Sequence, residues 1–202
     1  MAKIAHDMVM EGLGVGSNLE VEDRLVYRGG RNRDGMKHGK GVLITLDDND
    51  QEHIVYEGDY VEGQMEGDGK LYYLNGNCRY SGTFKAGLEH GRGAFYEADG
   101  TKRYTGEYQF GKEWGTGTWY HPSGQPEYIG EWEQGSPHGI GTHYNEKGAM
   151  SYHGGWAKGE IHGEGELYNA KGKVYWKGTF TDGSPDRDVA YCIALCTSCV
   201  YS

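Results

Sequence analysis

A unit of 24 residues recurs through most of this 202-residue chain. In the copy that begins at Tyr128, an aromatic residue is followed by Gly two positions later and by a second aromatic residue four positions later, with further glycines at positions 7, 11, 13 and 20. The same pattern starts at Tyr56, Tyr80, Tyr104 and Tyr152, and again at Trp176. Self-similarity at this spacing indicates a repeat architecture, in which one supersecondary unit stacks on copies of itself.

Within one unit, the spacing predicts a β-hairpin. Tyr128, Gly130 and Trp132 are two positions apart, so they share one face of an extended strand. The residues expected to share one face of the returning strand are Gly139, Gly141 and His143. Aromatic rings from one strand could then lie over glycines, where no Cβ prevents close approach. This packing would offset the roughly 0.5–1 kcal/mol that glycine normally costs a strand.

Two further sets of glycines mark the turns. The first strand of each hairpin is expected to close at Gly63, Gly87, Gly111, Gly135, Gly159 and Gly183. The second turn of each unit places Gly where a positive φ is expected, in Asn75-Gly76, Asp99-Gly100, Ser123-Gly124, Lys147-Gly148 and Lys171-Gly172.

The repeat divides the chain into three parts. Residues 1–26 fit the pattern poorly and are interpreted as a degenerate half-repeat that caps the N-terminal end. Residues 27–183 form the array, whose first unit, Tyr27–Val55, is irregular. Residues 184–202 lack the pattern and are expected to form a strand or short helix that covers the last exposed strand edge. The sequence thus predicts an all-β, elongated, single-layer solenoid of about seven stacked antiparallel β-hairpins with terminal caps.

Composition narrows the class of protein. Only 36% of the residues are hydrophobic, while the chain contains 36 Gly and 17 Tyr, so a large aliphatic core is excluded. The regular placement of the aromatic residues argues against disorder. The net charge of −10 repels nucleic acid on average. The sequence contains no recognisable signal peptide and no apolar stretch of transmembrane length, so an intracellular protein, cytoplasmic or associated with the cytoskeleton, is expected.

The repeat resembles a known family. The pattern is carried by Tyr128, Gly130, Trp132, Gly135, His138, Gly139 and Gly141, and it returns from Tyr80 and from Tyr152. It is similar to the MORN (membrane occupation and recognition nexus) repeat, and the resemblance extends over about residues 27–183. Two units depart from it by placing Glu66 and Trp114 in the His position, and the period is 24 where the commonest form has 23.

The resemblance implies an elongated array of β-hairpins that acts in scaffolding and protein–protein contact, for example in cytoskeletal or flagellar assembly. Some members of the family attach to phospholipid. The repeat itself carries no enzyme activity, so the chain is not expected to be an enzyme.

Two groups of residues could suggest a metal site. His38, His90, His138 and His162 recur in one phase, but stacked hairpins would separate successive copies by about 10 Å, too far to share a zinc ion with bonds of about 2.1 Å. They are interpreted as structural. Cys192, Cys196 and Cys199 have the spacing of a radical S-adenosylmethionine cluster motif without the barrel that should follow it. Their expected role is that of small apolar residues in the capping segment, and no metal or cofactor is predicted.

A basic cluster near the start of the array is the candidate anion-binding site. It consists of Arg28, Arg31, Arg33, Lys37 and Lys40, and together with Arg24 and Asp34 it gives this end a charge of roughly +5. The cluster could be a charged cap that keeps the end of the solenoid soluble. This interpretation is favoured over the binding of anionic membrane lipids or an acidic protein, although each Lys or Arg near an anionic membrane adds roughly 1 kcal/mol.

A row of tyrosines is the candidate protein-binding site. Tyr72, Tyr96, Tyr120, Tyr144 and Tyr168 stand 16 positions after the start of each unit and are expected on the face opposite the glycines. Such a row can bind another protein or can stack to hold the sheet flat, and the sequence leaves both open. Regularly spaced carboxylates, Glu107, Glu131, Glu133, Glu164 and Glu166, are interpreted as a solvated face that would prefer basic partners.

The sequence therefore favours a non-catalytic scaffold that binds other proteins along an aromatic- and acidic-lined β-surface. Self-association as a homodimer through end-to-end strand pairing is also compatible with such an array. The alternative is a membrane-associating adaptor that uses the basic end. Ligand binding of the type seen in choline-binding repeats is less consistent, because those repeats have a shorter period and a Gly-Trp step.

Overall fold

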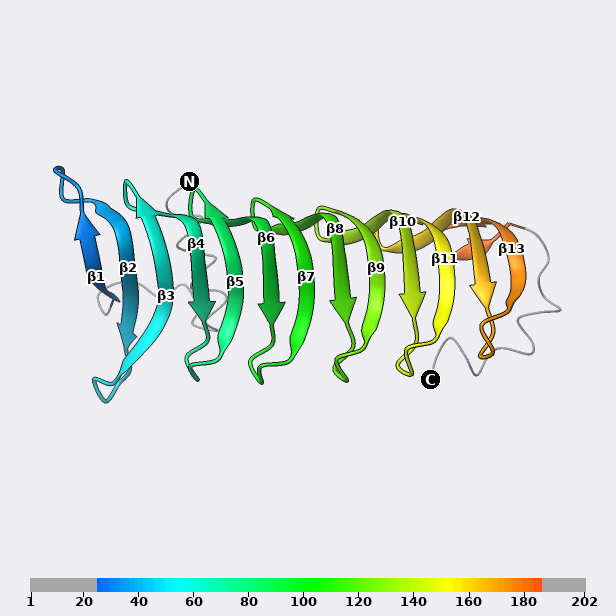
Figure 1. Ribbon diagram of the computed structural model, residues 1–202, viewed down its shortest axis with the longest axis horizontal. Helices are drawn as coiled ribbons and strands as arrows, with labels where there is room; N and C mark the ends of the chain where they lie inside the picture. Colours follow the sequence, from blue (N-terminus) through cyan, green and yellow to red (C-terminus); the bar gives the residue numbers. More distant parts are fainter. Residues whose placement is uncertain (1–24, 187–202) are drawn as a thin grey trace.

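The computed structural model describes residues 25–186, which form one open antiparallel β-sheet (Figure 1). The sheet has 14 strands, and their order in space is their order in the sequence. Each strand therefore pairs with its neighbours along the chain, and the structure grows by adding hairpins side by side. The predicted all-β, elongated, single-layer hairpin array is confirmed.

The first half of the sheet contains β1 (Leu25–Arg31), β2 (Lys37–Leu46), β3 (Glu52–Val61), β4 (Gln64–Tyr72), β5 (Cys78–Lys85), β6 (Leu88–Tyr96) and β7 (Lys102–Gln109). The second half contains β8 (Lys112–Tyr120), β9 (Pro126–Glu133), β10 (Ser136–Tyr144), β11 (Met150–Ala157), β12 (Glu160–Tyr168), β13 (Val174–Thr181) and β14 (Ser184–Pro185). The proposed caps lie almost entirely outside the described residues, as do Cys192, Cys196 and Cys199.

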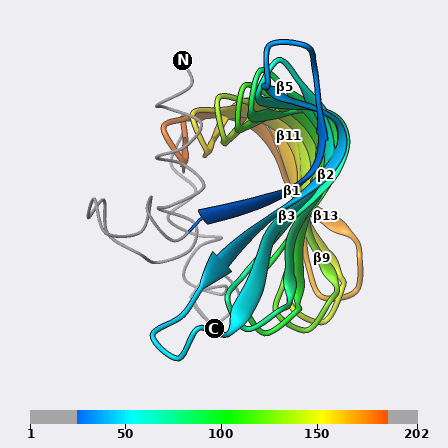
Figure 2. The same cartoon turned by 90° about the vertical axis from the view of Figure 1, so that its left-hand side faces the viewer.

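The sheet is strongly curved. Seen along its long axis, it has the form of an open channel, because most of its strands are curved (Figure 2). In the middle part of the strands, two glycines pair across neighbouring strands, as in Gly58 with Gly69 and Gly106 with Gly117, and these paired glycines are called the bend glycines below. Among the described residues there is no helix long and apolar enough to cross a membrane.

Tyrosine rings explain why glycine is needed at the bend. The ring of Tyr104 lies over the paired Gly106 and Gly117, and a Cβ on either glycine would collide with it. The same ring-on-glycine arrangement is built by Tyr27, Tyr56, Tyr80, Tyr128 and Tyr152. The face that carries these rings is called the aromatic face below, and the opposite one the polar face. The expectation that rings cover glycines is confirmed.

The rings of successive units form one continuous contact chain along the aromatic face. Tyr80 contacts Phe84 of its own unit and Tyr108 of the next, with ring centroids 5.1 and 5.2 Å apart and nearly perpendicular planes. This edge-to-face pattern runs from Tyr27 to Phe180 and Trp176. Each such pair contributes about 0.5–1.5 kcal/mol beyond burial of its area, so the chain couples every hairpin to the next.

Each of these tyrosine hydroxyls also donates a hydrogen bond. The acceptor is the backbone carbonyl three residues further along, for example Glu131 for Tyr128 at 2.8 Å and Gly155 for Tyr152 at 2.9 Å. The ring is therefore fixed at both ends, by packing on glycine and by the hydroxyl. Burial explains why the pKa of Tyr152 rises to about 12.

The turns fasten one hairpin to the next. Glu62 and Gly63 both have positive φ, 49° and 86°, and form the two-residue turn between β3 and β4, as type I′ geometry requires. The glycine amide of each two-residue turn donates to a carbonyl of the preceding hairpin, as Gly87 does to Met65 at 2.9 Å. The glycines of the second set of turns, Gly76, Gly100, Gly124, Gly148 and Gly172, also have positive φ, as predicted.

One part of the predicted hairpin is wrong. Gly139 does not share a face with Gly141: a Cβ on Gly139 would meet the Glu131 carboxylate on the polar face, whereas one on Gly141 would meet the Tyr128 ring. Gly139 has a φ of 58° and stands where the pairing of β9 with β10 shifts register. It is a bulge glycine, and the strict alternation assumed from the sequence fails at such a position.

The ring-on-glycine packing can be tested at Gly117, whose nearest atoms to an added Cβ all belong to Tyr104. Gly117→Ala should lower the free energy of unfolding by about 2–3 kcal/mol, as overpacking does. In a Tyr104→Leu background, the same substitution should cost much less, because the ring is gone. Urea unfolding of the four proteins gives the coupling. Equal costs in both backgrounds would refute the collision.

The aromatic contact chain can be tested at Phe84, which contacts the rings of Tyr56 and Tyr80. Phe84→Leu keeps most of the volume but removes both edge-to-face contacts, so a loss of about 1–3 kcal/mol is expected. Phe110→Leu is the control, because Phe110 is 54% exposed at a turn and lies outside this contact chain, packing on the ring of His90. Thermal melting should show a clearly larger fall in Tm for Phe84→Leu than for Phe110→Leu.

Candidate interaction surface

The polar face is built from the residues that flank the bend glycines. In each second strand, one residue precedes the glycine and one follows it, and both side chains point away from the tyrosine rings. The preceding residues, called the leading row, are Lys40, Asp68, Arg92, Thr116, Ile140 and Glu164. The following residues, called the trailing row, are Val42, Lys70, Ala94, Thr118, Thr142 and Glu166. First-strand residues such as Glu57 and Asp59 extend both rows.

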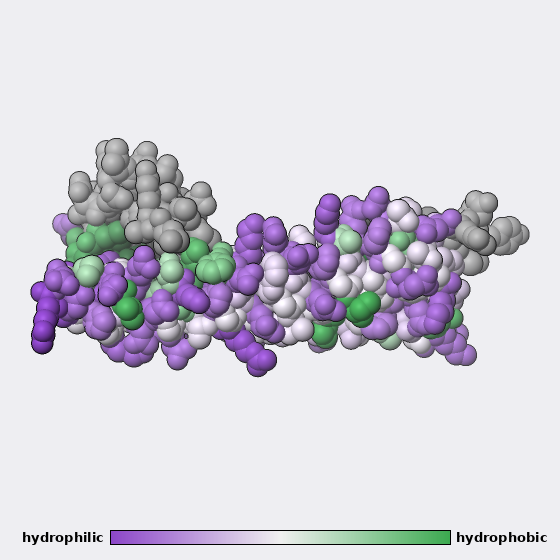
Figure 3. Space-filling model, turned by 90° about the horizontal axis from the view of Figure 1, so that it is seen from above, coloured by the Kyte–Doolittle hydropathy of each residue, from purple (hydrophilic) through white to green (hydrophobic). Residues whose placement is uncertain are grey.

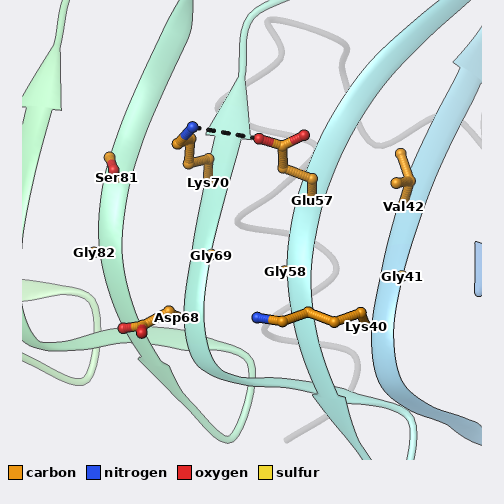
Figure 4. Close-up of a pocket in the computed structure, with 10 residues that line it drawn as sticks. All are labelled: Lys40, Gly41, Val42, Glu57, Gly58, Asp68, Gly69, Lys70, Ser81 and Gly82. Atoms are coloured by element: carbon orange, nitrogen blue, oxygen red, sulfur yellow. Dashed lines mark hydrogen bonds and ion pairs between the residues drawn. The ribbon is translucent and has the colours of Figure 1, made fainter.

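A groove lies between the two rows. Figure 4 shows Gly41, Gly58, Gly69 and Gly82 in a line, with Lys40 and Asp68 on one side and Val42, Glu57, Lys70 and Ser81 on the other. This cavity has a volume of about 500 Å³. A second cavity of about 400 Å³ shares Ser81 and continues over Gly93 and Gly106 to Thr116. The polar face thus carries a groove with a glycine floor and polar walls.

The charged groups of the first cavity are partly paired. Lys40 Nζ lies 2.7 Å from Asp59 Oδ2, and Lys70 Nζ lies 3.4 Å from Glu57 Oε1. Within residues 25–186, neither Asp68 nor Arg92 forms an ion pair. Two opposite charges of the leading row therefore remain available to a ligand.

The predicted tyrosine row lies on the polar face, beyond the trailing row. Its members, Tyr72, Tyr96, Tyr120, Tyr144 and Tyr168, are all half-buried rather than fully exposed. Tyr72 donates to Glu57, and burial together with this bond raises the pKa of its hydroxyl. Tyr168 donates to Glu166 at 2.7 Å, and the ammonium of Lys102 lies about 6 Å from the rings of Tyr96 and Tyr120.

The predicted acidic residues are engaged within the sheet. Glu107 accepts a bond from Thr116 at 2.9 Å, and Glu164 accepts one from Thr179 at 2.7 Å. Glu131 accepts a hydrogen bond from the backbone amide of Ile140, next to the bulge glycine Gly139. Lys177 and Tyr168 both donate to Glu166, which lowers the pKa of its carboxyl, and Glu133 lies 3.4 Å from His138.

The predicted basic cluster is divided between two faces. Arg28 forms a two-armed pair with Glu52, at 2.8 and 2.5 Å, and Lys40 is held by Asp59 on the polar face. Arg31 and Lys37 are on the aromatic face, with their charged groups 5.2 and 5.4 Å from the centroid of the Tyr27 ring.

Arg31 and Lys37, which both lie beside the Tyr27 ring, also interact electrostatically. Burial and the neighbouring Arg31 lower the pKa of the Lys37 ammonium. Arg33 is exposed in the turn between β1 and β2. The five residues that the sequence placed together thus do not form one patch, because alternate residues of a strand point to opposite faces.

In three units, the side chain at the recurrent His position contacts the next hairpin. The ring of His90 packs on Phe110, with centroids 5.1 Å apart, and His162 lies 3.7 Å from Asp182. Glu66, in the same position, accepts a hydrogen bond from the amide of Ala86 at 2.9 Å. These partners all stand at the two-residue turn of the following unit, which supports the structural interpretation. Among residues 25–186, no group of three or more His, Cys, Asp or Glu could hold a metal ion.

Sequence reasoning missed an ion pair on the aromatic face. Arg79 and Glu89 are 3.4 Å apart, and their side chains are only 15% and 13% exposed. Burial raises the pKa of the Glu89 carboxyl, with Arg79 opposing the shift. The free charges Asp68 and Arg92 were also missed, because only the cross-strand pairing shows which charges are neutralised.

On the face of the array seen in Figure 3, hydrophilic residues predominate and hydrophobic ones are fewer. Large hydrophobic residues that are exposed within residues 25–186 include Phe110 and Ile140, each 54% exposed, and Ile129, 41% exposed.

The comparison with protein families agrees with this geometry. The model described as MORN repeat matches residues 33–45, 56–78, 80–102, 104–125, 128–150 and 152–174. The matched segments cover more than half of the chain and contain the ring-forming tyrosines from Tyr56 to Tyr152 with the glycines that they cover. The comparison with curated proteins found no match. The chain belongs to the MORN repeat family.

Proposed function

We propose that this protein is a non-catalytic scaffold that binds other proteins along its polar face. The observation that carries the proposal is that only one of the two faces of the sheet is used for packing. The aromatic face uses its rings for the contact chain, with exposed fractions of only 0–1% for Tyr56, Tyr80 and Tyr104. The polar face is not needed for that packing and repeats the same framework over most of the sheet.

The tyrosine row supplies suitable anchors for a partner. Tyrosine presents a large amphipathic surface, and it is enriched among the residues that dominate interface energies. Tyr96, Tyr120 and Tyr144 are half-buried, so neighbouring residues restrict each side chain while part of it stays accessible. Anchors that are already ordered lose little conformational entropy on binding.

The alternative of a membrane adaptor has weaker support. Binding to anionic lipid through Arg28, Arg31, Arg33, Lys37 and Lys40 would need these charges free and on one surface. Arg28 and Lys40 are paired with Glu52 and Asp59. The alternative therefore depends on breaking two ion pairs, at roughly 0–1 kcal/mol each.

The proposal is tested with a variant that carries Tyr96→Ser, Tyr120→Ser and Tyr144→Ser. The matched control replaces three exposed turn-edge lysines, Lys85, Lys112 and Lys158, by Ser. Both proteins are first checked for cooperative unfolding. The amount of each stoichiometric partner that co-purifies with the tyrosine variant should be at least about tenfold lower than with the wild type, since hot-spot rings are worth about 2 kcal/mol each. The control should retain the same partners.

Two outcomes would overturn the proposal. One is a partner that binds the tyrosine variant normally but is lost from the turn-edge control. The other is recovery only on vesicles of anionic phospholipid, abolished by Arg31→Ala and Arg33→Ala, which would establish the membrane alternative.

A further inference from the structure

The groove on the polar face is continuous over several repeats. Its two cavities, of about 500 and 400 Å³, meet at Ser81 and together extend from β2 to β8. Six strand spacings of about 4.8 Å give a length near 29 Å. The groove runs across the strands, so an occupant would contact residues of four successive repeats.

The cross-section of the groove restricts the occupant. The residues of its two walls are two positions apart on each strand, which separates their Cα atoms by about 7 Å. An α-helix with its side chains is about 10–12 Å wide and would not enter. The floor is glycine backbone whose strands are paired on both sides, so it offers close contact but few free hydrogen-bonding groups. Recognition must therefore come from the walls.

The walls carry two free charges in register. Asp68 and Arg92 occupy the same position in consecutive units, 24 residues apart, and both belong to the leading row. Neither has an ion-pair partner among the described residues, whereas Lys40 and Lys70 do. Glu107, which pairs with Arg92 across β6 and β7, accepts its hydrogen bond from Thr116 instead.

The spacing of these charges matches an extended peptide. One repeat is two strand spacings, so Asp68 and Arg92 lie about 10 Å apart along the groove. An extended chain advances about 3.3 Å per residue and therefore covers this distance in about three residues. The length of the groove corresponds to about nine residues.

We propose that this groove binds an extended segment of a partner protein, which runs across β2 to β8. The segment carries a basic side chain opposite Asp68 and, three residues away, an acidic side chain opposite Arg92. This inference rests on the proposed scaffold function and names the chemistry of one partner. A phosphate or lipid headgroup fits the site less well, because Asp68 and Glu57 would repel it.

The test uses a library of random dodecapeptides, selected against the full-length chain. The key variant exchanges the two charges, Asp68→Arg with Arg92→Asp, and keeps the net charge. The matched control makes the same kind of exchange at exposed positions of the turn edge, Glu62→Lys with Lys85→Glu. Circular dichroism and melting establish that both variants fold. The single variants Asp68→Asn and Arg92→Gln provide a second, milder comparison.

The wild type and the control should select peptides with a basic and an acidic residue three positions apart, in one preferred order. The exchanged variant should select the opposite order. A peptide selected on the wild type should bind the exchanged variant at least about tenfold more weakly at physiological ionic strength, by fluorescence anisotropy.

The inference is overturned if no peptide is selected, or if the selected peptides bind the wild type and the exchanged variant equally. Its failure is distinguishable from failure of the scaffold function. If partners recovered through the tyrosine row also bind the exchanged variant normally, the scaffold function stands and the groove inference falls.

Discussion

The structure depends on the contact between a tyrosine ring and a pair of glycines. Because Gly106 and Gly117 have no side chain, the Tyr104 ring can lie directly on the backbone of two neighbouring strands. The ring is then close enough to its neighbours for edge-to-face contact with Tyr108 and Trp132. A single layer of β-sheet has no second layer to bury its apolar side chains. The bend and the rings replace that layer, which explains how 36 Gly and a hydrophobic content of 36% are compatible with a folded chain.

The same contact explains why the fold was readable from the sequence. Tyr128, Gly130 and Gly141 are fixed by one geometric requirement, so they recur in every regular unit and predict the hairpin, its length and its turns. Gly139 shows the limit of this reasoning. Both glycines are required, but Gly141 makes room for a ring, while Gly139 adopts the positive φ of a bulge. Residue identity alone does not separate these two reasons.

The candidate surface was less predictable, because binding depends on which side chains remain free. The basic residues from Arg28 to Lys40 are neighbours in the sequence, yet strand alternation sends Arg31 to the aromatic face and pairs Arg28 with Glu52, 24 residues away. The tyrosine row was placed on the correct face, but its half-buried state results from neighbours in adjacent units. Pairing across strands therefore determines which side chains are available for binding, and this pairing can be inferred from the sequence only indirectly.

The leading row consists of positions that the packing of the sheet does not constrain. The tyrosines and glycines of the ring-on-glycine packing recur in every regular unit, because a change at either would break a packing requirement. The leading row reads Lys40, Asp68, Arg92, Thr116, Ile140 and Glu164, and the fold requires no particular residue there. Where one framework is copied along an array, a position that differs in every copy gives each repeat its own chemistry at a fixed spacing. An extended ligand that crosses the strands would meet these residues in order, about 10 Å apart, so its sequence could be read one repeat at a time.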